Sequence, residues 1–561
     1  MSSSTASRRG SIARGSIARA SIARGAYVLI LAAFIGAALN IYEPAMEGAF
    51  VSDDLHYVAN NEFVHELDVE SVLVLFDPFG DATGAVVNYT PVHLLLHAVA
   101  WKAFEREVRG HHVVNIVFHC LASVLLIALF LRTGIPRTGA ILGGTLFLLH
   151  PANVEAVAWI SQLKSSSSLV LSLAALLAMP RRAGLGCAFF VLALFAKPTA
   201  AFVLPVAFLF EWTDTRRSDP PHRPIRWKWF GLMALIFVAY AVVEFSAHQR
   251  SGAAEAVLYD TPFTLVRTVF ALALRYLVMS STSLGVSAFH EPEPATSPLD
   301  PWWLCSLIVL GLIGWRVVIV LLARKTELAY WAWALVSYAP VSQVFPFLYP
   351  LADRYLYFIL PGLIGASFLA GAEAIERGPP PLGRMPRIPV ESVSRVLLAL
   401  GLVVAVVFGV RSHTRAAVWR SSATIVADAA AHYPNGVSAN LLRAKRDAQM
   451  GDVDGAVAGV RAAMRRGYNR FEQLLNDPAF EPVRESPKFR GVVREIAAGW
   501  IASIRELEDP TQLELQMAAQ AHLVRNERAQ AVEMFRRALS RGGKYDDLMR
   551  AHLAALGSSV D

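Results

Sequence analysis

Residues 302–323 read WWLCSLIVLGLIGWRVVIVLLA, an apolar run whose single charge is Arg316. A helix of about 20 such residues is long enough to cross the hydrocarbon core of a bilayer. Runs of this kind recur along the chain, so the sequence predicts an all-α, polytopic transmembrane helical bundle. The further apolar segments are 26–46, 113–131, 138–150, 167–179, 184–196, 199–211, 229–246, 263–285, 328–346, 355–375 and 393–411.

The composition supports a membrane protein. Of 561 residues, 55% are hydrophobic and 17% are charged, whereas about 25% of the residues in a soluble domain are charged. The net charge of +7 does not indicate nucleic-acid binding, because the basic residues lie at the borders of apolar segments. The three cysteines, Cys120, Cys187 and Cys305, lie inside apolar segments. A disulfide framework is therefore not expected.

Residues 1–25 form a basic, low-complexity arm in which the tetrapeptide SIAR occurs three times. The repeats bring Arg14, Arg19 and Arg24 up to the first apolar run. A cleaved signal peptide starts in a similar way, but no A-x-A-like cleavage site clearly follows. We therefore expect an uncleaved signal-anchor helix with the arm in the cytoplasm.

Clusters of Arg and Lys predict which loops are cytoplasmic. The basic loops are 132–137, 181–182, 216–228, 324–325 and 377–387. The loops 47–92, 151–166, 286–300 and 347–354 are then outside. This assignment is consistent only if segment 263–285, with Arg275 and a polar SSTS stretch, is re-entrant or lies on the surface; if it spans fully, the remaining topology is inverted. The transmembrane domain, 26–411, then has about eleven spans, and the C-terminus is outside.

Residues 412–561 have a different character, because they contain helical periodicity but no spanning run. An internal repeat with an offset of 75 residues aligns Ala444, Ala456, Ala463 and Gly467 with Ala519, Ala531, Ala538 and Gly542. The spacing fits two TPR-type helical hairpins of about 34 residues plus an insertion. A TPR-like domain offers a concave surface for a protein or peptide partner. The alternative is a generic helical bundle that covers the membrane domain.

Two adjacent acids open the first outer loop, 47–92, in the segment SDDLHYVANN. Asp53 and Asp54 follow the first span almost at once, so they are expected at the outer rim of the membrane. A carboxylate that is partly desolvated there can take up a proton near neutral pH. We interpret the pair as catalytic and favour Asp54 over Asp53. The alternative is an ordinary polar loop.

Polar side chains also gather in GHHVVNIVFHC and in HPANVEAVAWISQLKSS. From these segments we expect substrate-binding roles for His112, Asn115, His150, Glu155 and Lys164. Helix-packing hydrogen bonds could explain one or two of these residues, but not the whole group on the outer side. The spacing of His and Glu does not fit a zinc site, so no metal ligands are predicted.

Three further charged residues lie in or beside apolar segments. Lys197 interrupts two apolar pieces, and a lysine there is expensive unless it reaches water or an anion. Asp353 and Arg354 lie in YPLADRYLY. The guanidinium fork of Arg354 can hold a phosphate with two parallel hydrogen bonds. We expect all three residues to bind substrate; an interfacial anchor within an aromatic belt is the alternative for the Asp–Arg pair.

Five segments occur in a fixed order, namely SDDLHYVANN, GHHVVNIVFH, HPANVEAVAWISQLKS, AKPTAAFVLPVAFLFEW and YPLADRYLY, and TPR-like repeats follow them. This order resembles the transmembrane-and-TPR protein O-mannosyltransferase family and its bacterial relatives, within the GT-C glycosyltransferase superfamily. The resemblance covers nearly the whole chain. One departure is Ser165, because the family often has an acidic residue after the basic residue at this position.

The resemblance implies transfer of a sugar from a polyprenyl-phosphate donor to a hydroxyl group on protein, with inversion at the anomeric carbon. It also implies that the acidic pair, Asp53 and Asp54, holds the catalytic carboxylate. No cofactor is required, although these acids could bind a divalent metal. The expected location is a bacterial inner membrane with the tail in the periplasm. A non-catalytic membrane scaffold that recruits envelope proteins is the alternative, and a lipid flippase is a less suitable one because the membrane half lacks a convincing repeat.

Overall fold

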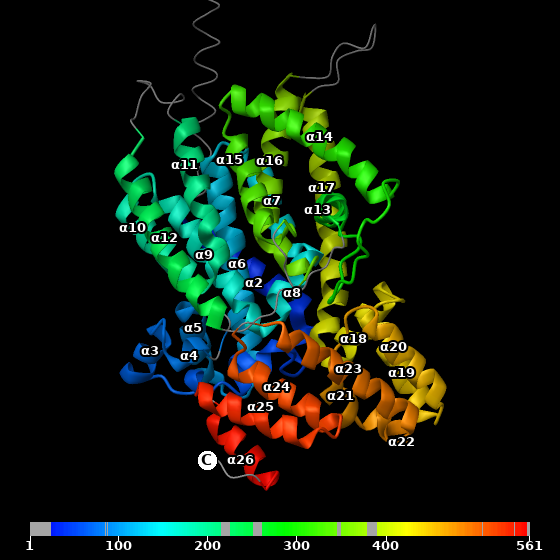
Figure 1. The fold of residues 1–561 in the computed structure, drawn as a ribbon. Coiled ribbons are helices and arrows are strands. Elements are labelled where there is room, and N and C mark those ends of the chain that lie inside the picture. The colour runs from blue at the N-terminus through cyan, green and yellow to red at the C-terminus, as the bar shows by residue number, and fades with distance from the viewer. Residues whose placement is uncertain are drawn as a thin grey trace, which may run out of the picture.

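The computed structural model describes residues 24–84, 86, 88–214, 225–250, 261–344, 349–377, 390–507, 509–542 and 545–557. Throughout these ranges the regular structure is helical, with no strand (Figure 1). The basic arm, apart from Arg24 and Gly25, lies outside the described residues. The fold is therefore the all-α, polytopic class that the apolar runs predict.

Eight helices are long and apolar enough to cross a membrane, as judged within the described part of the chain. They are α2 (Arg24–Met46), α6 (Val108–Arg132), α9 (Leu163–Ala178, with the preceding turn), α12 (Trp227–Arg250), α13 (Pro262–Thr282), α14 (Pro301–Leu322), α16 (Asp353–Arg377) and α17 (Val390–Ala416). The bent pair α7 (Arg137–Leu149) and α8 (Val154–Ala158) makes a ninth if it counts as one span. The protein is thus a multi-pass membrane protein.

The sequence-based count of about eleven spans differs from this number for two reasons. It included three helices that are too short for the length criterion, α10 (Ala183–Ala196), α11 (Val203–Asp214) and α15 (Glu327–Tyr338). These helices still pack inside the bundle, against α9, α15 and α16 respectively. It also left out α13, which meets the criterion.

Helix α13 runs across its neighbours rather than along them. Figure 1 shows it almost end-on, while α6 and α16 are seen lengthwise. Its residues contact the ends of other elements: the Tyr338 hydroxyl donates to the carbonyl of Val269 over 2.9 Å, and the amide of Ala352 donates to the Tyr276 hydroxyl over 3.2 Å. Helix α13 thus lies at an angle to the helices beside it.

The charge inside the apolar run 302–323 is neutralised within the bundle. Arg316 on α14 forms ion pairs with Glu327 over 2.6 Å and with Glu373 over 2.7 Å. Lys325 also pairs with Glu373. Because a buried charge is tolerated in a membrane when it has such partners, Arg316 does not prevent α14 from spanning.

The helix break between α7 and α8 positions the site described below. Pro151 cannot donate the hydrogen bond that would continue α7, and the two helices meet at an angle of 50°. The ring of His150 stabilises the break, since its Nδ1 accepts from the amide of Ala152 over 3.1 Å and its Nε2 lies 3.1 Å from the carbonyl of Ser280. His150 therefore stabilises the break through both of its ring nitrogens.

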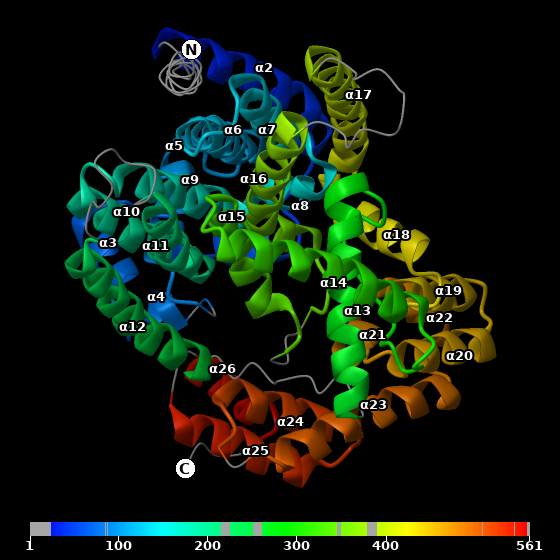
Figure 2. The ribbon, with the colours of Figure 1, turned by 90° about the horizontal axis from the view of Figure 1, so that it is seen from above.

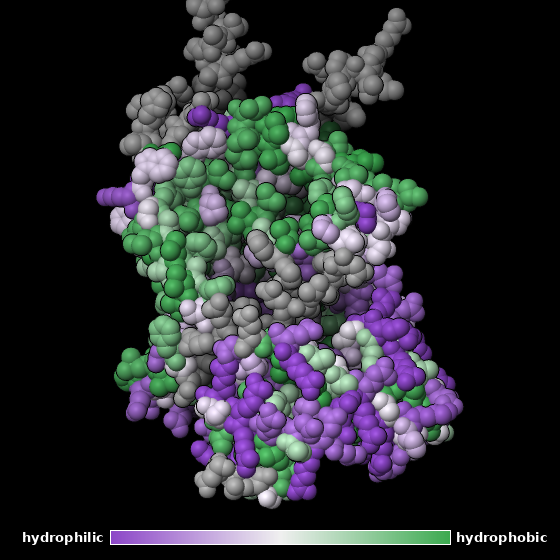
Figure 3. All heavy atoms as spheres, viewed as in Figure 1, coloured by the Kyte–Doolittle hydropathy of each residue, from purple (hydrophilic) through white to green (hydrophobic). Residues whose placement is uncertain are grey.

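The first outer loop and the C-terminal region lie on the same side of the bundle (Figure 1). The loop contains α3 (Val69–Phe76) and α4 (Asp81–Gly84), and α5 (Pro91–Phe104) begins at its end. The amide of Ala49 donates to the carbonyl of Arg420 over 3.1 Å, and the Arg420 guanidinium lies 3.4 Å from Glu47. Space-filling views separate a largely apolar bundle from a largely hydrophilic C-terminal region (Figure 3).

The C-terminal region consists of packed helices. They are α18 (Ser422–His432), α19 (Val437–Gln449), α20 (Val453–Met464), α21 (Phe471–Asn476), α22 (Glu481–Arg484), α23 (Pro487–Arg505), α24 (Gln512–Val524), α25 (Arg528–Arg541) and α26 (Asp546–Ala555). The repeated alanines are buried where α19 meets α20 and where α24 meets α25. Gly467 and Gly542 have positive φ angles of 95° and 64°, which glycine adopts without strain. Seen from above, these helices form an arc at one side of the membrane helices (Figure 2).

Candidate functional site

Asp54 is the most enclosed acid of the first outer loop. Its side chain is buried, and both carboxylate oxygens accept backbone hydrogen bonds. Oδ2 accepts from the amide of Val51 over 3.1 Å, and Oδ1 accepts from the amide of Ser161 over 2.7 Å. Burial is the main reason that the pKa of Asp54 rises to about 7. A carboxyl group with this pKa can accept a proton at neutral pH and release it again.

Asp53 has a different environment from its neighbour. It is partly exposed, and its recorded side-chain partner is the Ser52 hydroxyl at 3.5 Å. Ser52 adopts a positive φ of 51°, so the chain turns sharply just before the two acids. The turn directs the neighbouring side chains to different environments, and Asp54 is the one enclosed by protein.

Asn115 holds the irregular segment that carries Ser161 in place. Its side-chain amide donates to the carbonyl of Val157 over 2.9 Å and to that of Trp159 over 3.2 Å. Its carbonyl oxygen accepts from the Ser166 hydroxyl over 2.5 Å. The bonds of the side-chain amide satisfy backbone carbonyl groups in the segment between α8 and α9, where the regular helical hydrogen bonds are interrupted. Asn115 therefore positions the segment that carries Ser161 through the backbone of that segment.

Glu155 and Arg354 form a buried ion pair at the same end of the bundle. The Nη1 atom of Arg354 donates to Oε1 of Glu155 over 2.5 Å, and the backbone amide of Arg354 donates to Oε2 over 2.7 Å. Three aromatic rings surround the guanidinium, with centroids 5.4 Å (Trp159), 5.1 Å (Tyr349) and 4.9 Å (Tyr355) from its central carbon. Glu155 thus occupies one edge of the guanidinium fork.

Lys164 and Lys197 add positive charge beside this pair. The Lys197 ammonium donates to the Ser165 hydroxyl over 2.8 Å. The charged groups of Lys164, Arg354 and Glu155 are close enough to interact electrostatically with this ammonium. The Lys164 ammonium lies 4.6 Å from the centre of the Tyr57 ring. Lys164 and Lys197 are thus two basic residues beside the Glu155–Arg354 pair, and an anion such as a phosphate would stabilise their charged forms.

Asp353 does not belong to this group, although it is next to Arg354 in the sequence. Its carboxylate accepts from the amide of Ser287 over 3.1 Å and pairs with Nε2 of His290 over 2.7 Å. The other ring nitrogen of His290 lies 2.9 Å from the hydroxyl of Tyr433, which directly follows α18. Asp353 therefore connects the membrane domain to the C-terminal region through His290.

His112 is buried near the site, and its Nε2 has no hydrogen-bond partner in the structure. Two other buried histidines, His93 and His97 on α5, are not among the predicted site residues, and their Nε2 atoms lie 2.8 Å apart. A spacing of four residues places two histidines on one face of a helix, and this is the signal that the sequence offers. The surrounding residues are apolar, however, and are equally typical of a helix that only packs. No three His, Cys, Asp or Glu side chains within the described ranges are arranged to hold a metal ion.

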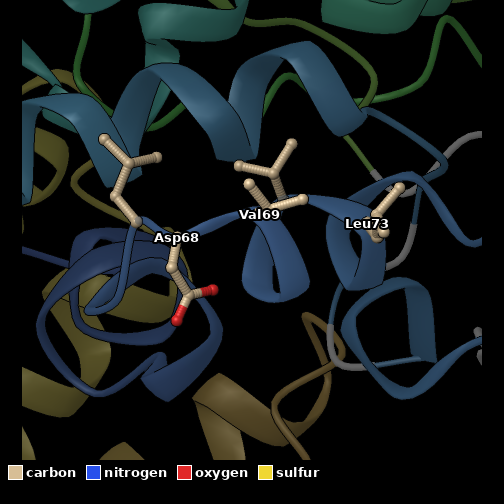
Figure 4. Close-up of a pocket in the computed structure, with 5 residues that line it drawn as sticks. Asp68, Val69 and Leu73 are labelled. Atoms are coloured by element: carbon tan, nitrogen blue, oxygen red, sulfur yellow. The ribbon is translucent and has the colours of Figure 1, made fainter.

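A surface pocket of about 350 Å³ lies elsewhere, on the first outer loop. It is lined by Leu67, Asp68, Val69, Val72 and Leu73 (Figure 4). None of the predicted site residues lines it. The candidate site consists instead of the buried Asp54, Ser161 and Glu155 together with the partly buried Lys164, Lys197 and Arg354.

No protein-family model matches the chain, and no solved structure matches it. Several curated proteins are similar to part of the chain. A protein O-mannosyl-transferase of Caenorhabditis elegans is 26% identical over 199 residues, which is 33% of this chain and 28% of the relative. The protein O-mannosyl-transferase Tmtc1 of Drosophila melanogaster is 30% identical over 155 residues, 27% of this chain and 18% of the relative.

A third relative, the protein O-mannosyl-transferase TMTC1 of Mus musculus, is 28% identical over 163 residues, 28% of this chain and 17% of the relative. The chain thus spans less than a third of the length of these curated relatives. Over a quarter to a third of its own length, the chain is similar to proteins named protein O-mannosyl-transferases.

Proposed function

We propose that this protein is a membrane glycosyltransferase of the transmembrane-and-TPR O-mannosyltransferase type, acting with a polyprenyl-phosphate-linked sugar and a hydroxyl group of a protein acceptor. The observation that carries the proposal is the buried Asp54 carboxylate, which two backbone amides hold; one of them belongs to Ser161, in the segment that also carries Glu155, the ion-pair partner of Arg354, and Lys164. The similarity to protein O-mannosyl-transferases supports it and favours mannose as the sugar.

In the proposed reaction, the acceptor oxygen attacks the anomeric carbon of the sugar from the face opposite the phosphate. The bond between the anomeric carbon and the phosphate oxygen breaks as the new glycosidic bond forms, so the configuration inverts. Asp54 takes the proton that the acceptor hydroxyl loses. A free hydroxyl has a pKa far above 7, and a positioned base therefore lowers the barrier to attack.

The leaving group would be the lipid phosphate. Negative charge grows on its oxygen as the bond breaks, and fixed cations that face developing charge stabilise the transition state. Lys164, Lys197 and Arg354 are the candidates for this role. The reaction as written balances without a metal or an organic cofactor. The lipid tail of the donor would lie among the membrane helices, which explains why such an enzyme is embedded in a bilayer.

The proposal is tested by supplying radiolabelled polyprenyl-phosphate sugars and membrane proteins to the purified protein in vitro. Transfer that is present in the wild type and lost in Asp54→Asn, while donor binding is retained, would support it. A wild-type protein that binds neither polyprenyl phosphate nor its sugar conjugates would overturn it.

The proposal extends to location and to the C-terminal helices. The basic loops favour an orientation with Asp54 and residues 412–561 on the outer side, in the periplasm of a bacterium. We propose that these TPR-like helices select the acceptor protein. A variant without residues 412–561 should then bind the donor but transfer less sugar to protein. An enzyme reporter that works only in the periplasm should therefore be active when it is fused to the C-terminus.

A further inference from the structure

Two fully buried histidines face each other on α5. His93 and His97 are one helical turn apart, their Nε2 atoms are 2.8 Å apart, and their ring centres are 4.5 Å apart. Neither side chain is accessible to solvent. The pair is therefore a polar element inside a region that otherwise packs with apolar side chains.

The hydrogen bond between the two rings determines what their other nitrogens offer. One ring donates from Nε2, so its Nδ1 carries no proton and is an acceptor. The other ring accepts at Nε2, so its proton is on Nδ1 and this atom is a donor. Neither Nδ1 atom has a hydrogen-bond partner in the structure. The pair thus presents one donor and one acceptor, both buried, and leaving them unsatisfied is costly.

The pair is neutral under physiological conditions. Burial, with the nearby charge of Lys164, lowers the pKa of both rings, and the pKa of His97 falls to about 3. A charged imidazolium would donate from both of its nitrogens and could not act as an acceptor. The neutral state preserves the combination of one donor and one acceptor.

The pair lies beside the candidate site. The ring of His93 is 5.5 Å from that of Tyr57, and Tyr57 also lies under the ammonium of Lys164. The backbone of Ser161 lies beside the His93 ring, and its amide donates to Asp54. A single residue therefore connects the histidine pair to the proposed base.

We infer that His93 and His97 form a subsite for hydroxyl groups of the donor sugar. A sugar hydroxyl donates one hydrogen bond and accepts others, so one hydroxyl or two adjacent ones can satisfy both Nδ1 atoms. A phosphodiester only accepts and would leave one of them unpaired, which assigns the phosphate to the cations instead. The inference rests on the proposed function and adds to it the recognition of the sugar.

The test measures donor binding rather than turnover. The ligands are polyprenyl-phosphate mannose, its single deoxy analogues, and polyprenyl phosphate without sugar. In the wild type, at least one deoxy analogue should bind about tenfold more weakly than the parent, since a lost hydrogen bond to a buried group costs this much or more. In His93→Gln and in His97→Gln that difference should disappear, while binding of polyprenyl phosphate without sugar stays at the wild-type level.

His119→Gln serves as the matched control, because this buried histidine already has both ring nitrogens paired, with the Tyr357 hydroxyl and the carbonyl of Leu148. It should keep the wild-type preference for the parent sugar. A variant that still binds polyprenyl phosphate without sugar is correctly folded. If a variant does not bind this ligand, His97→Asn is used in its place.

If the deoxy analogues lose the same affinity in the wild type and in both variants, the pair has only a packing role and the inference is wrong. If the wild type binds no polyprenyl phosphate of any kind, the proposed function fails instead. The two failures are therefore distinct.

Discussion

The backbone amide of Ser161 donates to Oδ1 of Asp54 over 2.7 Å, although the two residues are 107 positions apart in the sequence. This bond attaches the first outer loop to the break between α8 and α9. It also fixes one carboxylate oxygen, so that the orientation of the proposed base is set by two distant segments.

Replacing Asp54 by Asn should reduce sugar transfer by about 100- to 10,000-fold, the usual range for loss of a general base. Asn has nearly the same shape but cannot accept the proton. Donor binding should remain near the wild-type level. Asp53→Asn is the matched control, because Asp53 is partly exposed and lies outside the enclosed position; it should retain most of the turnover. Transfer that survives in Asp54→Asn would remove this residue from the mechanism.

The rate of transfer should depend on pH through Asp54. Since its pKa is raised to about 7, kcat/KM should rise as the pH increases from 5 to 8, with a midpoint near 7. The ordinary pKa of this group is 3.8, so the folded protein binds the proton more tightly than the unfolded chain. Stability contributed by the protonated carboxyl is therefore lost as the pH rises from about 4 through about 7.

The same linkage predicts the behaviour of the variant. Asp54→Asn should be more stable than the wild type at pH 8, by on the order of 2–4 kcal/mol, and similar to it at pH 4. Thermal unfolding in detergent at both pH values measures this difference. An equal change in stability at both pH values would mean that Asp54 is not protonated preferentially in the folded state.

The sequence predicts the fold class and most of the site, because both depend on patterns that are local. Apolar length identifies the spanning helices, and polar residues at the ends of these helices include Asp54, Glu155, Lys164, Lys197 and Arg354. The pairing of these residues is a tertiary property. Arg354 pairs with Glu155, which is 199 positions away, and its neighbour Asp353 pairs with His290.

The functional interpretation of His93 and His97 could not come from the sequence for a related reason. Histidines at this spacing in an apolar helix are compatible with packing, with a ligand site or with a metal site. What distinguishes them is that both Nδ1 atoms remain without a partner after α5 has packed. His150 shows the opposite case, because the helix break uses both of its ring nitrogens.

Arg354→Lys should weaken donor binding by about tenfold, and Arg354→Ala should weaken it further. The guanidinium can pair with Glu155 through one edge and still offer another edge to a phosphate, whereas an ammonium is a single point charge. Arg411→Lys is the control, since the guanidinium of Arg411 contacts the carbonyl of Thr282, outside the candidate site. The measurement is the Kd for polyprenyl phosphate in detergent. Unchanged affinity in both Arg354 variants would restrict this residue to the ion pair.

Glu291→Gln should loosen the attachment of the C-terminal helices to the membrane domain. Its carboxylate accepts from the amide of Val437 over 2.5 Å at the start of α19, where a negative charge also interacts favourably with the helix dipole. Limited proteolysis should release the C-terminal helices several-fold faster than in the wild type. Glu293→Gln is the control, because its ion pair with Arg466 is exposed and such pairs contribute little. Equal release from both variants would contradict the docking role of Glu291.

Helix α3 should lie in the surface of the membrane. Val69 and Leu73, one turn apart, are 79% and 67% exposed, while the carboxylate of Asp68 is hydrogen bonded to the amide of Ser71 at the start of the helix. An apolar face of this kind, carried by a loop that follows a spanning helix, is typical of interfacial helices.

The position of α3 can be measured with nitroxide labels on single cysteines in lipid bilayers. Labels at Val69 and Leu73 should be reached by oxygen dissolved in the lipid more than by a water-soluble nickel chelate, because these side chains would contact the acyl chains. A label at Glu70, which is exposed on another face of the same helix, is the control and should show the reverse preference. If all three labels are equally accessible to the chelate, the apolar face is directed to water and α3 does not anchor the loop. Preferential protection of Val69 and Leu73 would fix the height of the first outer loop at the bilayer surface, where the sugar of a lipid-linked donor must reside.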